Sequence, residues 1–259
     1  MEEEPKRPLI LISNDDGINS PGLFALATSL RTIGEVIVVA PDREQSAVGH
    51  SLTMNTPLRV TPFRRNGEVF GFAVNGTPAD CVKIALTALL KRTPDIVISG
   101  INHGQNTAIN ILYSGTVSAS TEGMLFGIKS IAFSVCSHNW DLDMRPSAYY
   151  AALITQKSLS MEFPKDTFLN VNIPAVPQSE IKGMKLTNVG NGYWKDFYDK
   201  RSDPFNREYY WFSGEYYESA NDIANDDIAV REKFVSITPI KYSLTNKAAF
   251  DFFNGFEQE

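Results

Sequence analysis

The residues best suited to chemistry begin with an acidic pair, Asp15 and Asp16, that directly follows a short apolar run at residues 9–12. A run of this length bounded by turn residues is typical of a buried parallel strand, and ligands of open α/β sheets bind beyond the carboxyl ends of such strands. We therefore expect the two carboxylates at a ligand site. Taken alone, the pair is also explained by turn formation, since Asp and Gly are common in turns.

Two further loops bring oxygen-bearing side chains to the same edge of the predicted sheet. Ser46 follows a second apolar segment, residues 35–40, while Asn102 and Asn106 follow a third, residues 95–99. Parallel strands share their carboxyl ends, so these side chains are expected near the acidic pair. Such oxygens suit Mg²⁺, Mn²⁺ or Ca²⁺, whereas zinc sites usually contain histidine or cysteine. The pattern predicts one divalent cation, although each residue singly is also explained as a turn or loop-stabilising side chain.

A second type of site is predicted where Ser114-Gly115-Thr116 precedes a helix. Backbone N–H groups at a helix amino terminus, together with two hydroxyls, form an anion site of the kind that holds phosphate. A cation site beside a phosphate site indicates phosphoryl chemistry. His103 lies in the same long loop, residues 100–116, and is compatible either with a general acid or with loop packing.

The elements that must position these residues form an α/β fold. A strand at residues 9–12, a helix at residues 23–34 and a strand at residues 35–40 make a βαβ unit, for which parallel strands and a right-handed crossover are expected. Asn66-Gly67 between alternating segments predicts a hairpin that extends from the sheet. Further strands are expected at residues 95–99, 130–135, 168–174 and 234–240, and further helices after Thr77, after Gly115, at residues 148–159 and at residues 248–256.

The carboxyl-terminal third has a different texture. Residues 182–218 contain many tyrosines, glycines and charges with little periodicity, which favours irregular strands and an arm. Aromatic surface of this kind usually needs a second surface to cover it, so we predict at least a dimer. We expect one domain over residues 1–259, with a core at 1–180 and an extension at 181–259 that carries an oligomerisation arm and a terminal helix.

Composition excludes several classes of protein. The formal net charge of −6 argues against a surface built to bind a nucleic-acid duplex. The charged start lacks the apolar segment of a signal peptide, and no later run has the roughly 18 to 20 apolar residues of a membrane span. Cys81 and Cys136 have no metal-site spacing and are expected to be buried and reduced. We expect a cytoplasmic protein that does not bind membranes.

Several motifs in this order resemble the SurE survival-protein family of metal-dependent nucleotidases. The match spans residues 9–240 and is weakest at 182–224. Its motifs are LISNDDGINSPG, VVAPDREQSAVGHSLT, VNGTPADCV, PDIVISGINHGQN, YSGTVSASTEG and FVSITPI.

The resemblance implies a Rossmann-like, three-layer α/β/α core with a mostly parallel sheet and carboxyl-terminal elements exchanged within a homodimer or homotetramer. It also implies hydrolysis of nucleoside 5′- and 3′-monophosphates with a bound Mg²⁺ or Mn²⁺, with Ca²⁺ able to replace it in crystals. The residues matching the family's metal ligands are Asp15, Asp16, Ser46 and Asn102. Those matching its phosphate site are Asn106, Ser114, Gly115 and Thr116. The chain departs from the family pattern at His103, where a small residue is common, and near Asn110, where an aspartate is common.

The expected mechanism has water attack a phosphoryl group that the cation polarises, with Asp15 or Asp16 taking the proton from the water. Attack by Asp15 itself, forming an aspartyl phosphate, is the alternative route. Two rival functions remain: a receiver-like regulatory protein, which would need an aspartate at the end of the third strand, and a nucleotide-binding protein without phosphatase activity. Dinucleotide binding lacks its GxGxxG motif after the first strand.

Overall fold

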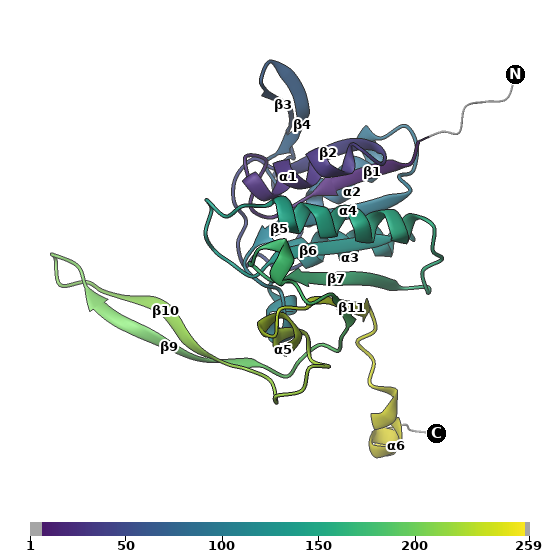
Figure 1. The fold of residues 1–259 in the computed structure, drawn as a ribbon. Helices are drawn as coiled ribbons and strands as arrows, with labels where there is room; N and C mark the ends of the chain where they lie inside the picture. Colours follow the sequence, from purple (N-terminus) through teal and green to yellow (C-terminus); the bar gives the residue numbers. More distant parts are fainter. Residues whose placement is uncertain (1–6, 257–259) are drawn as a thin grey trace, which may run out of the picture.

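A computed structural model describes residues 7–256, whose centre is a nine-stranded sheet (Figure 1). The charged start, residues 1–6, on which the prediction about a signal peptide rests, lies outside the described residues, as do residues 257–259. The strands of this sheet are β1 (Leu9–Ser13), β2 (Glu35–Pro41), β3 (Val60–Arg65), β4 (Glu68–Val74), β5 (Ile96–His103), β6 (Ser130–Val135), β7 (Thr167–Ile173), β8 (Met184–Leu186) and β11 (Val235–Lys241).

The order of the strands is β3-β4-β2-β1-β5-β6-β7-β11-β8. The strands from β4 to β7 are all parallel, which confirms the prediction of a mostly parallel sheet. At the two margins β3 runs antiparallel to β4, and β11 runs antiparallel to β7. The predicted hairpin at Asn66-Gly67 therefore exists, but its second strand also belongs to the main sheet, because Val39 and Phe72 are paired.

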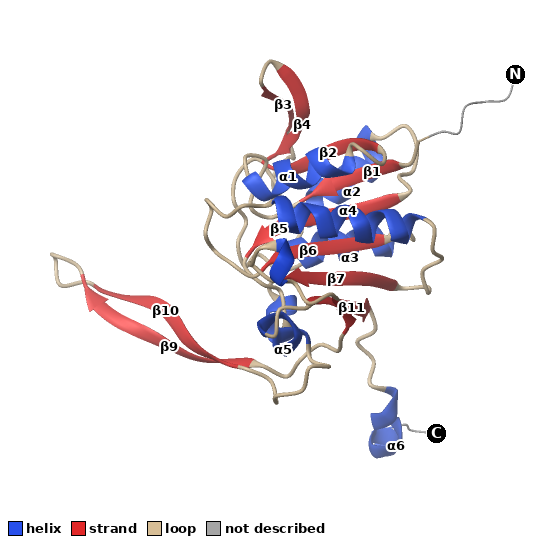
Figure 2. Ribbon diagram, viewed as in Figure 1, coloured by secondary structure: helices blue, strands red, loops and turns tan. Residues whose placement is uncertain are grey.

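Helices cover both faces of the sheet, giving three layers (Figure 2). One face carries α1 (Pro21–Leu30) and α4 (Arg145–Leu159), and the other carries α2 (Pro78–Ile84) and α3 (Gly115–Leu125). Successive side chains of β1 serve opposite faces, since Ile10 and Ile12 pack with α1 whereas Leu11 packs with α2. Burial on both faces explains why the run is apolar throughout rather than alternating.

One predicted strand differs from the structure at the carboxyl edge. The third strand does not end at Ser99, because β5 continues to His103 with a shift of register between Ser99 and Asn102. The Gly100–Ile101 peptide bond is cis. A Cβ at Gly100 would lie 2.2 Å from the carbonyl oxygen of Phe133, so only glycine fits there. Because β5 extends to His103, Asn102 and His103 lie on the end of a strand and not in the predicted loop.

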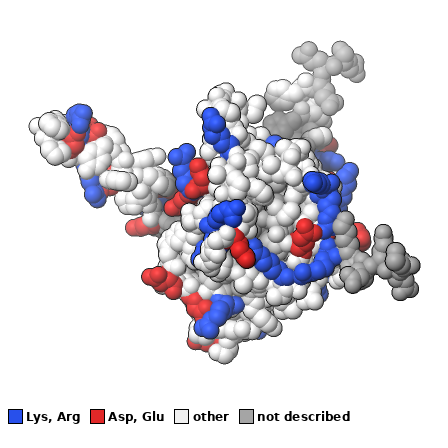
Figure 3. All heavy atoms as spheres, turned by 90° about the horizontal axis from the view of Figure 1, so that it is seen from above, with Lys and Arg blue, Asp and Glu red and all other residues white. Residues whose placement is uncertain are grey.

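The expected arm is a regular antiparallel hairpin of β9 (Tyr193–Ser202) and β10 (Glu208–Tyr217), which projects from the body (Figure 1). Its strands expose large aromatic side chains, and its tip carries both signs of charge (Figure 3). The sequence patterns did not predict α5 (Asp226–Arg231). The terminal helix is shorter than expected, since only α6 (Phe250–Phe253) is α-helical. None of the helices in residues 7–256 has the length and apolar character needed to cross a bilayer.

Candidate active site

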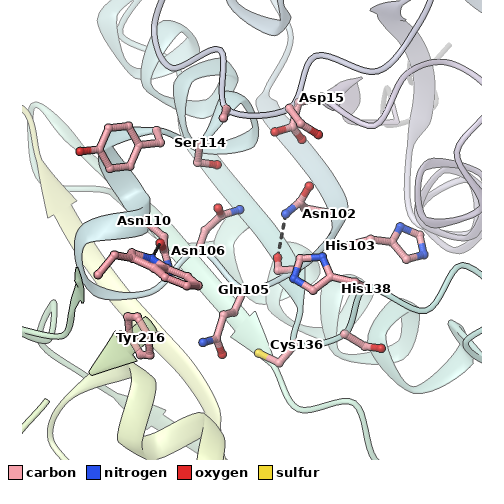
Figure 4. A pocket seen from close by; sticks show the side chains of 16 residues that line it. Asp15, Asn102, His103, Gln105, Asn106, Asn110, Ser114, Cys136, His138 and Tyr216 are labelled. Atoms are coloured by element: carbon pink, nitrogen blue, oxygen red, sulfur yellow. Dashed lines mark hydrogen bonds between the residues drawn. The ribbon is translucent and has the colours of Figure 1, made fainter. Parts of the chain in front are cut away.

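A cavity of about 490 Å³ lies at the carboxyl ends of β1, β2 and β5, where the predicted loops meet (Figure 4). Its lining includes four of the predicted oxygen-bearing residues together with the predicted phosphate-site serine. The remaining walls come from the residues after β5, from the loop after β6 and from the base of the β9–β10 hairpin. The lining residues used below are Asp15, Ser46, Asn102, His103, Gly104, Asn106, Asn110, Tyr113, Ser114, Cys136, His138, Trp194 and Tyr216.

Asp15 is the buried carboxylate of this cavity, with 6% of its surface exposed. The hydroxyl of Thr116 donates a hydrogen bond to its Oδ1 atom. Burial, followed by the negative charge of Asp16, raises the pKa of Asp15 from 3.8 to about 6, and hydrogen bonds from Thr116 partly oppose this rise. A buried carboxylate beside a second one is poorly stabilised without a cation, which is the electrostatic condition for a metal ligand.

Asp16 is held from the other side. Its Oδ2 atom accepts hydrogen bonds from the main-chain N–H of His103 at 3.0 Å and from the Nδ1 atom of the same residue at 3.1 Å. Among the described residues, nothing forms a hydrogen bond with its Oδ1 atom, which therefore remains available to a ligand. Asp16 lies beside Asp15 in sequence but is not part of the cavity wall itself.

Asn102 and Ser46 complete the predicted oxygen set. The side-chain Nδ2 atom of Asn102 donates to the carbonyl of Gly104 at 2.7 Å, and this bond turns its Oδ1 atom toward Asp15 (Figure 4). Ser46 lines the cavity from an exposed loop, where its hydroxyl donates to Glu44. The loop is tied to the acidic pair because the N–H of Gln45 donates to the carbonyl of Asp15 at 2.8 Å.

The donor set fits a hard divalent cation, since every one of these side chains offers oxygen. No group of three His, Cys, Asp or Glu side chains capable of holding a metal occurs within residues 7–256. A cation at this edge would therefore need the hydroxyl and carboxamide oxygens in addition to the two carboxylates. Oxygen donors of this kind suit a hard divalent cation better than zinc.

In the Ser114-Gly115-Thr116 segment, Ser114 faces the cavity whereas Thr116 binds Asp15. Ser114 caps α3 by accepting a hydrogen bond from the N–H of Val117 at 3.1 Å, and it lines the cavity. Thr116 is fully buried, and its hydroxyl is engaged by Asp15, so that hydroxyl is not free for a phosphate. Gly115 permits the close approach, because a Cβ there would lie 2.7 Å from the Cβ of Asp15.

Asn106 is fixed by polar side chains that the sequence patterns did not indicate. Its main-chain N–H donates to Asn172 at 2.8 Å, its carbonyl accepts from Asn170 at 2.7 Å, and its Nδ2 atom donates to Ser134 at 2.8 Å. Asn170 and Asn172 are fully buried on β7. The sequence FLNVNIP does contain a signal for these contacts. Asn170 and Asn172 stand at alternate positions of a predicted buried strand, so both side chains point to one face, and buried polar side chains need hydrogen-bond partners.

The far wall of the cavity is aromatic and comes from the hairpin base. The indole Nε1 of Trp194 donates to Oδ1 of Asn110 at 2.8 Å, and its ring lies 5.3 Å from that of Tyr216. The hydroxyl of Tyr216 donates in turn to the buried Asp227 at 3.1 Å. The sequence patterns predict only an arm here and do not indicate its contribution to the cavity, because 84 residues separate Trp194 from Asn110.

Comparisons with known proteins agree on one family. The family model described as survival protein SurE matches residues 10–196. The 5′-nucleotidase SurE of Chlorobium chlorochromatii (strain CaD3) is 45% identical over 242 residues, which cover 93% of this chain and 89% of that protein. The 5′-nucleotidase SurE of Natranaerobius thermophilus is 44% identical over 255 residues, with 96% and 98% covered.

A solved structure also resembles the whole fold. The crystal structure of the SurE protein from Aquifex aeolicus superposes with a TM-score of 0.84 at 40% sequence identity, covering 97% of this chain and 100% of that chain. The family model matches well over half of the chain, and the relatives match nearly all of it. The chain therefore belongs to the SurE survival-protein family.

Proposed function

We propose that this protein is a metal-dependent nucleotidase that hydrolyses nucleoside 5′- and 3′-monophosphates to nucleoside and phosphate. The observation that carries the proposal is that carboxylate and amide oxygens lie at one end of the cavity and aromatic rings at the other. The relatives named 5′-nucleotidase SurE, at 41% to 45% identity, support the same reaction.

The proposed metal ligands are Asp15, Asp16, Ser46 and Asn102, with one Mg²⁺ or Mn²⁺ per subunit. When bound, such a cation supplies charge for a phosphoryl oxygen and lowers the pKa of a coordinated water. The protein's part is to hold the oxygens in place. Thr116 orients Asp15, His103 contacts Asp16, and the carbonyl of Gly104 orients Asn102.

The proposed phosphate site consists of the Asn106 carboxamide and the Ser114 hydroxyl, with the main chain at the start of α3. Asn106 carries two N–H donors on Nδ2, of which Ser134 takes one, so one remains for a phosphoryl oxygen. These donors stabilise charge that develops on the phosphoryl group as the ester bond breaks. Asp15 or Asp16 accepts the proton of the attacking water.

The aromatic end of the cavity is the proposed nucleoside site. Trp194, Tyr113 and Tyr216 line the cavity with flat surfaces on which a base can stack, and Trp194 is held in orientation by Asn110. A volume of about 490 Å³ lies within the range of small-ligand sites, which typically enclose about 300 to 1,000 Å³.

We further propose that the extension, residues 181–259, serves assembly into a homodimer or homotetramer with exchanged carboxyl-terminal elements. The exposed rings of the β9–β10 hairpin and of α6, among them Trp211, Phe212 and Phe252, support this assignment. The division into a core at 1–180 and this extension is part of the same proposal. A cytoplasmic location is supported by the two free thiols, Cys81 and Cys136.

The test is phosphate release from a panel of nucleoside 5′- and 3′-monophosphates, with Mn²⁺, with Mg²⁺ and with EDTA, for the wild type and for Ser114→Ala. Activity that needs a metal and falls at least tenfold in the variant is expected. If no substrate releases phosphate with either metal, the proposal is contradicted, and nucleotide binding without catalysis is favoured instead. A phosphorylated Asp15 trapped during turnover would contradict direct attack by water.

A further inference from the structure

His103 contacts the proposed metal ligand Asp16 with both its side chain and its main chain, and it is one of the residues that line the cavity. It follows Asn102 on β5, and its imidazole points away from the cavity (Figure 4). Only 2% of its side chain is exposed. Burying an imidazole is unfavourable unless its polar atoms form hydrogen bonds, so the contacts of this ring must compensate for its burial.

The contacts of His103 converge on one oxygen atom. Its main-chain N–H and its Nδ1 atom lie 3.0 and 3.1 Å from the Oδ2 atom of Asp16. An ionised carboxylate only accepts hydrogen bonds, so Nδ1 carries the hydrogen and donates it. Both donors act on Oδ2 and neither on Oδ1, so the two oxygens of this carboxylate are in different environments.

The ring of His103 is held in this orientation. It stacks on the indole of Trp140, with the ring centroids 4.6 Å apart and the planes inclined by 12°. Its Nε2 atom is buried and has no hydrogen-bond partner among residues 7–256. A lone pair on Nε2 tolerates such a site better than an N–H group would, which again assigns the hydrogen to Nδ1.

We propose that His103 is a positioning residue that fixes Asp16 by hydrogen bonding its Oδ2 atom and leaves Oδ1 directed to a divalent cation. This inference rests on the metal site of the proposed function. Without the Nδ1 donor the carboxylate of Asp16 keeps only the main-chain N–H of His103 to hold its orientation, and it loses one of the two donors that offset repulsion from Asp15. Hydrogen-bond partners of metal-binding carboxylates typically contribute about 10-fold to 100-fold to metal affinity.

The test compares Mn²⁺ affinity, measured by electron paramagnetic resonance of the free ion, in metal-free preparations of the wild type and of two variants. His103→Leu fills the space without a donor, whereas His103→Asn restores an N–H near the position of Nδ1. We expect His103→Leu to weaken Mn²⁺ binding at least tenfold and His103→Asn to remain within about threefold of the wild type. His103→Ala replaces His103→Leu if circular dichroism shows the latter to be unfolded.

Three results would overturn the inference. One is Mn²⁺ affinity in His103→Leu within threefold of the wild type, and another is equal weakening in both variants, since packing rather than the donated hydrogen would then matter. The third is an equal loss in Tyr149→Leu, which changes an exposed side chain of α4 that does not line the cavity. A wild type that binds no Mn²⁺ would instead contradict the proposed function itself.

Discussion

Replacing Asp15 with asparagine is predicted to stabilise the metal-free protein while abolishing activity. Burial, and then the charge of Asp16, raises the pKa of Asp15 from 3.8 to about 6, so above pH 6 the folded protein holds an unfavourable charge. A rise of this size corresponds to about 3 kcal/mol, at about 1.4 kcal/mol for each tenfold change in proton affinity. The asparagine amide cannot accept hydrogen bonds from both the hydroxyl and the main-chain N–H of Thr116 as the carboxylate does. This loss offsets about 1 kcal/mol of the gain in unfolding free energy.

The sign of the shift sets the pH dependence of this effect. The folded state of the wild type binds the Asp15 proton more tightly than the unfolded chain does, so stability falls as the pH rises from about 4 to about 6. Asparagine has no such titration. The variant should therefore be about 2 kcal/mol more stable than the wild type at pH 7.5 and no more stable than it near pH 4.

Urea unfolding in EDTA at both pH values measures the difference. Adding Mn²⁺ at pH 7.5 should make the wild type more stable than the variant, because only the wild type gains binding free energy from the cation. A variant no more stable than the wild type at pH 7.5, or an equal gain at both pH values, would refute the reasoning that the acidic pair is an unfavourable site awaiting a cation.

Two other substitutions test separate parts of the site, and a third tests an ion-paired carboxylate of α3 outside the cavity. Thr116→Val removes the hydroxyl that donates to Asp15, and should lower kcat and cost about 1 to 3 kcal/mol in urea unfolding; a variant equal to the wild type in both would contradict this role. Trp194→Ala removes the proposed stacking surface, and should raise KM about tenfold for a nucleoside monophosphate but not for ribose 5-phosphate; equal effects on both would argue against a base site. Burial raises the pKa of Glu122, but the contacts with His50 and Lys83 outweigh burial, so the net pKa in the folded protein is lowered. The ionised carboxylate therefore stabilises the fold above the ordinary pKa of 4.5, and this stabilisation is lost as the pH falls through the pKa of the folded state. Glu122→Gln should accordingly lower the melting temperature at pH 7.5, with a difference that shrinks on acidification; a constant difference would contradict the linkage.

The sheet and the edge that carries the site could be predicted because both depend on local patterns. Residues 9–12 are apolar on both faces, which favours a central parallel strand, and parallel strands bring their carboxyl ends together whatever their separation in sequence. That rule sufficed to group Asp15 with Asn102 and Ser114, and all three line one cavity.

The partners of those residues could not be predicted, because they depend on distances across the fold. The contact between Asp16 and His103 joins positions 87 residues apart and requires β5 to continue past Ser99. Thr116 contacts Asp15 while Ser114 faces the cavity because α3 begins very close to Asp15, which the sequence does not reveal. The aromatic wall depends on where the base of the hairpin lies, which its weak periodicity did not indicate.

The most direct test of the proposed reaction site is the location of bound Mn²⁺ by anomalous scattering, from crystals grown with Mn²⁺ and inorganic phosphate. We expect one Mn²⁺ peak per subunit enclosed by Asp15, Asp16, Ser46 and Asn102, with phosphate density between that peak and the side chains of Asn106 and Ser114. A peak held by other residues, or no peak at the carboxyl edge of the sheet, would contradict the assignment of this cavity as the metal-dependent nucleotidase site.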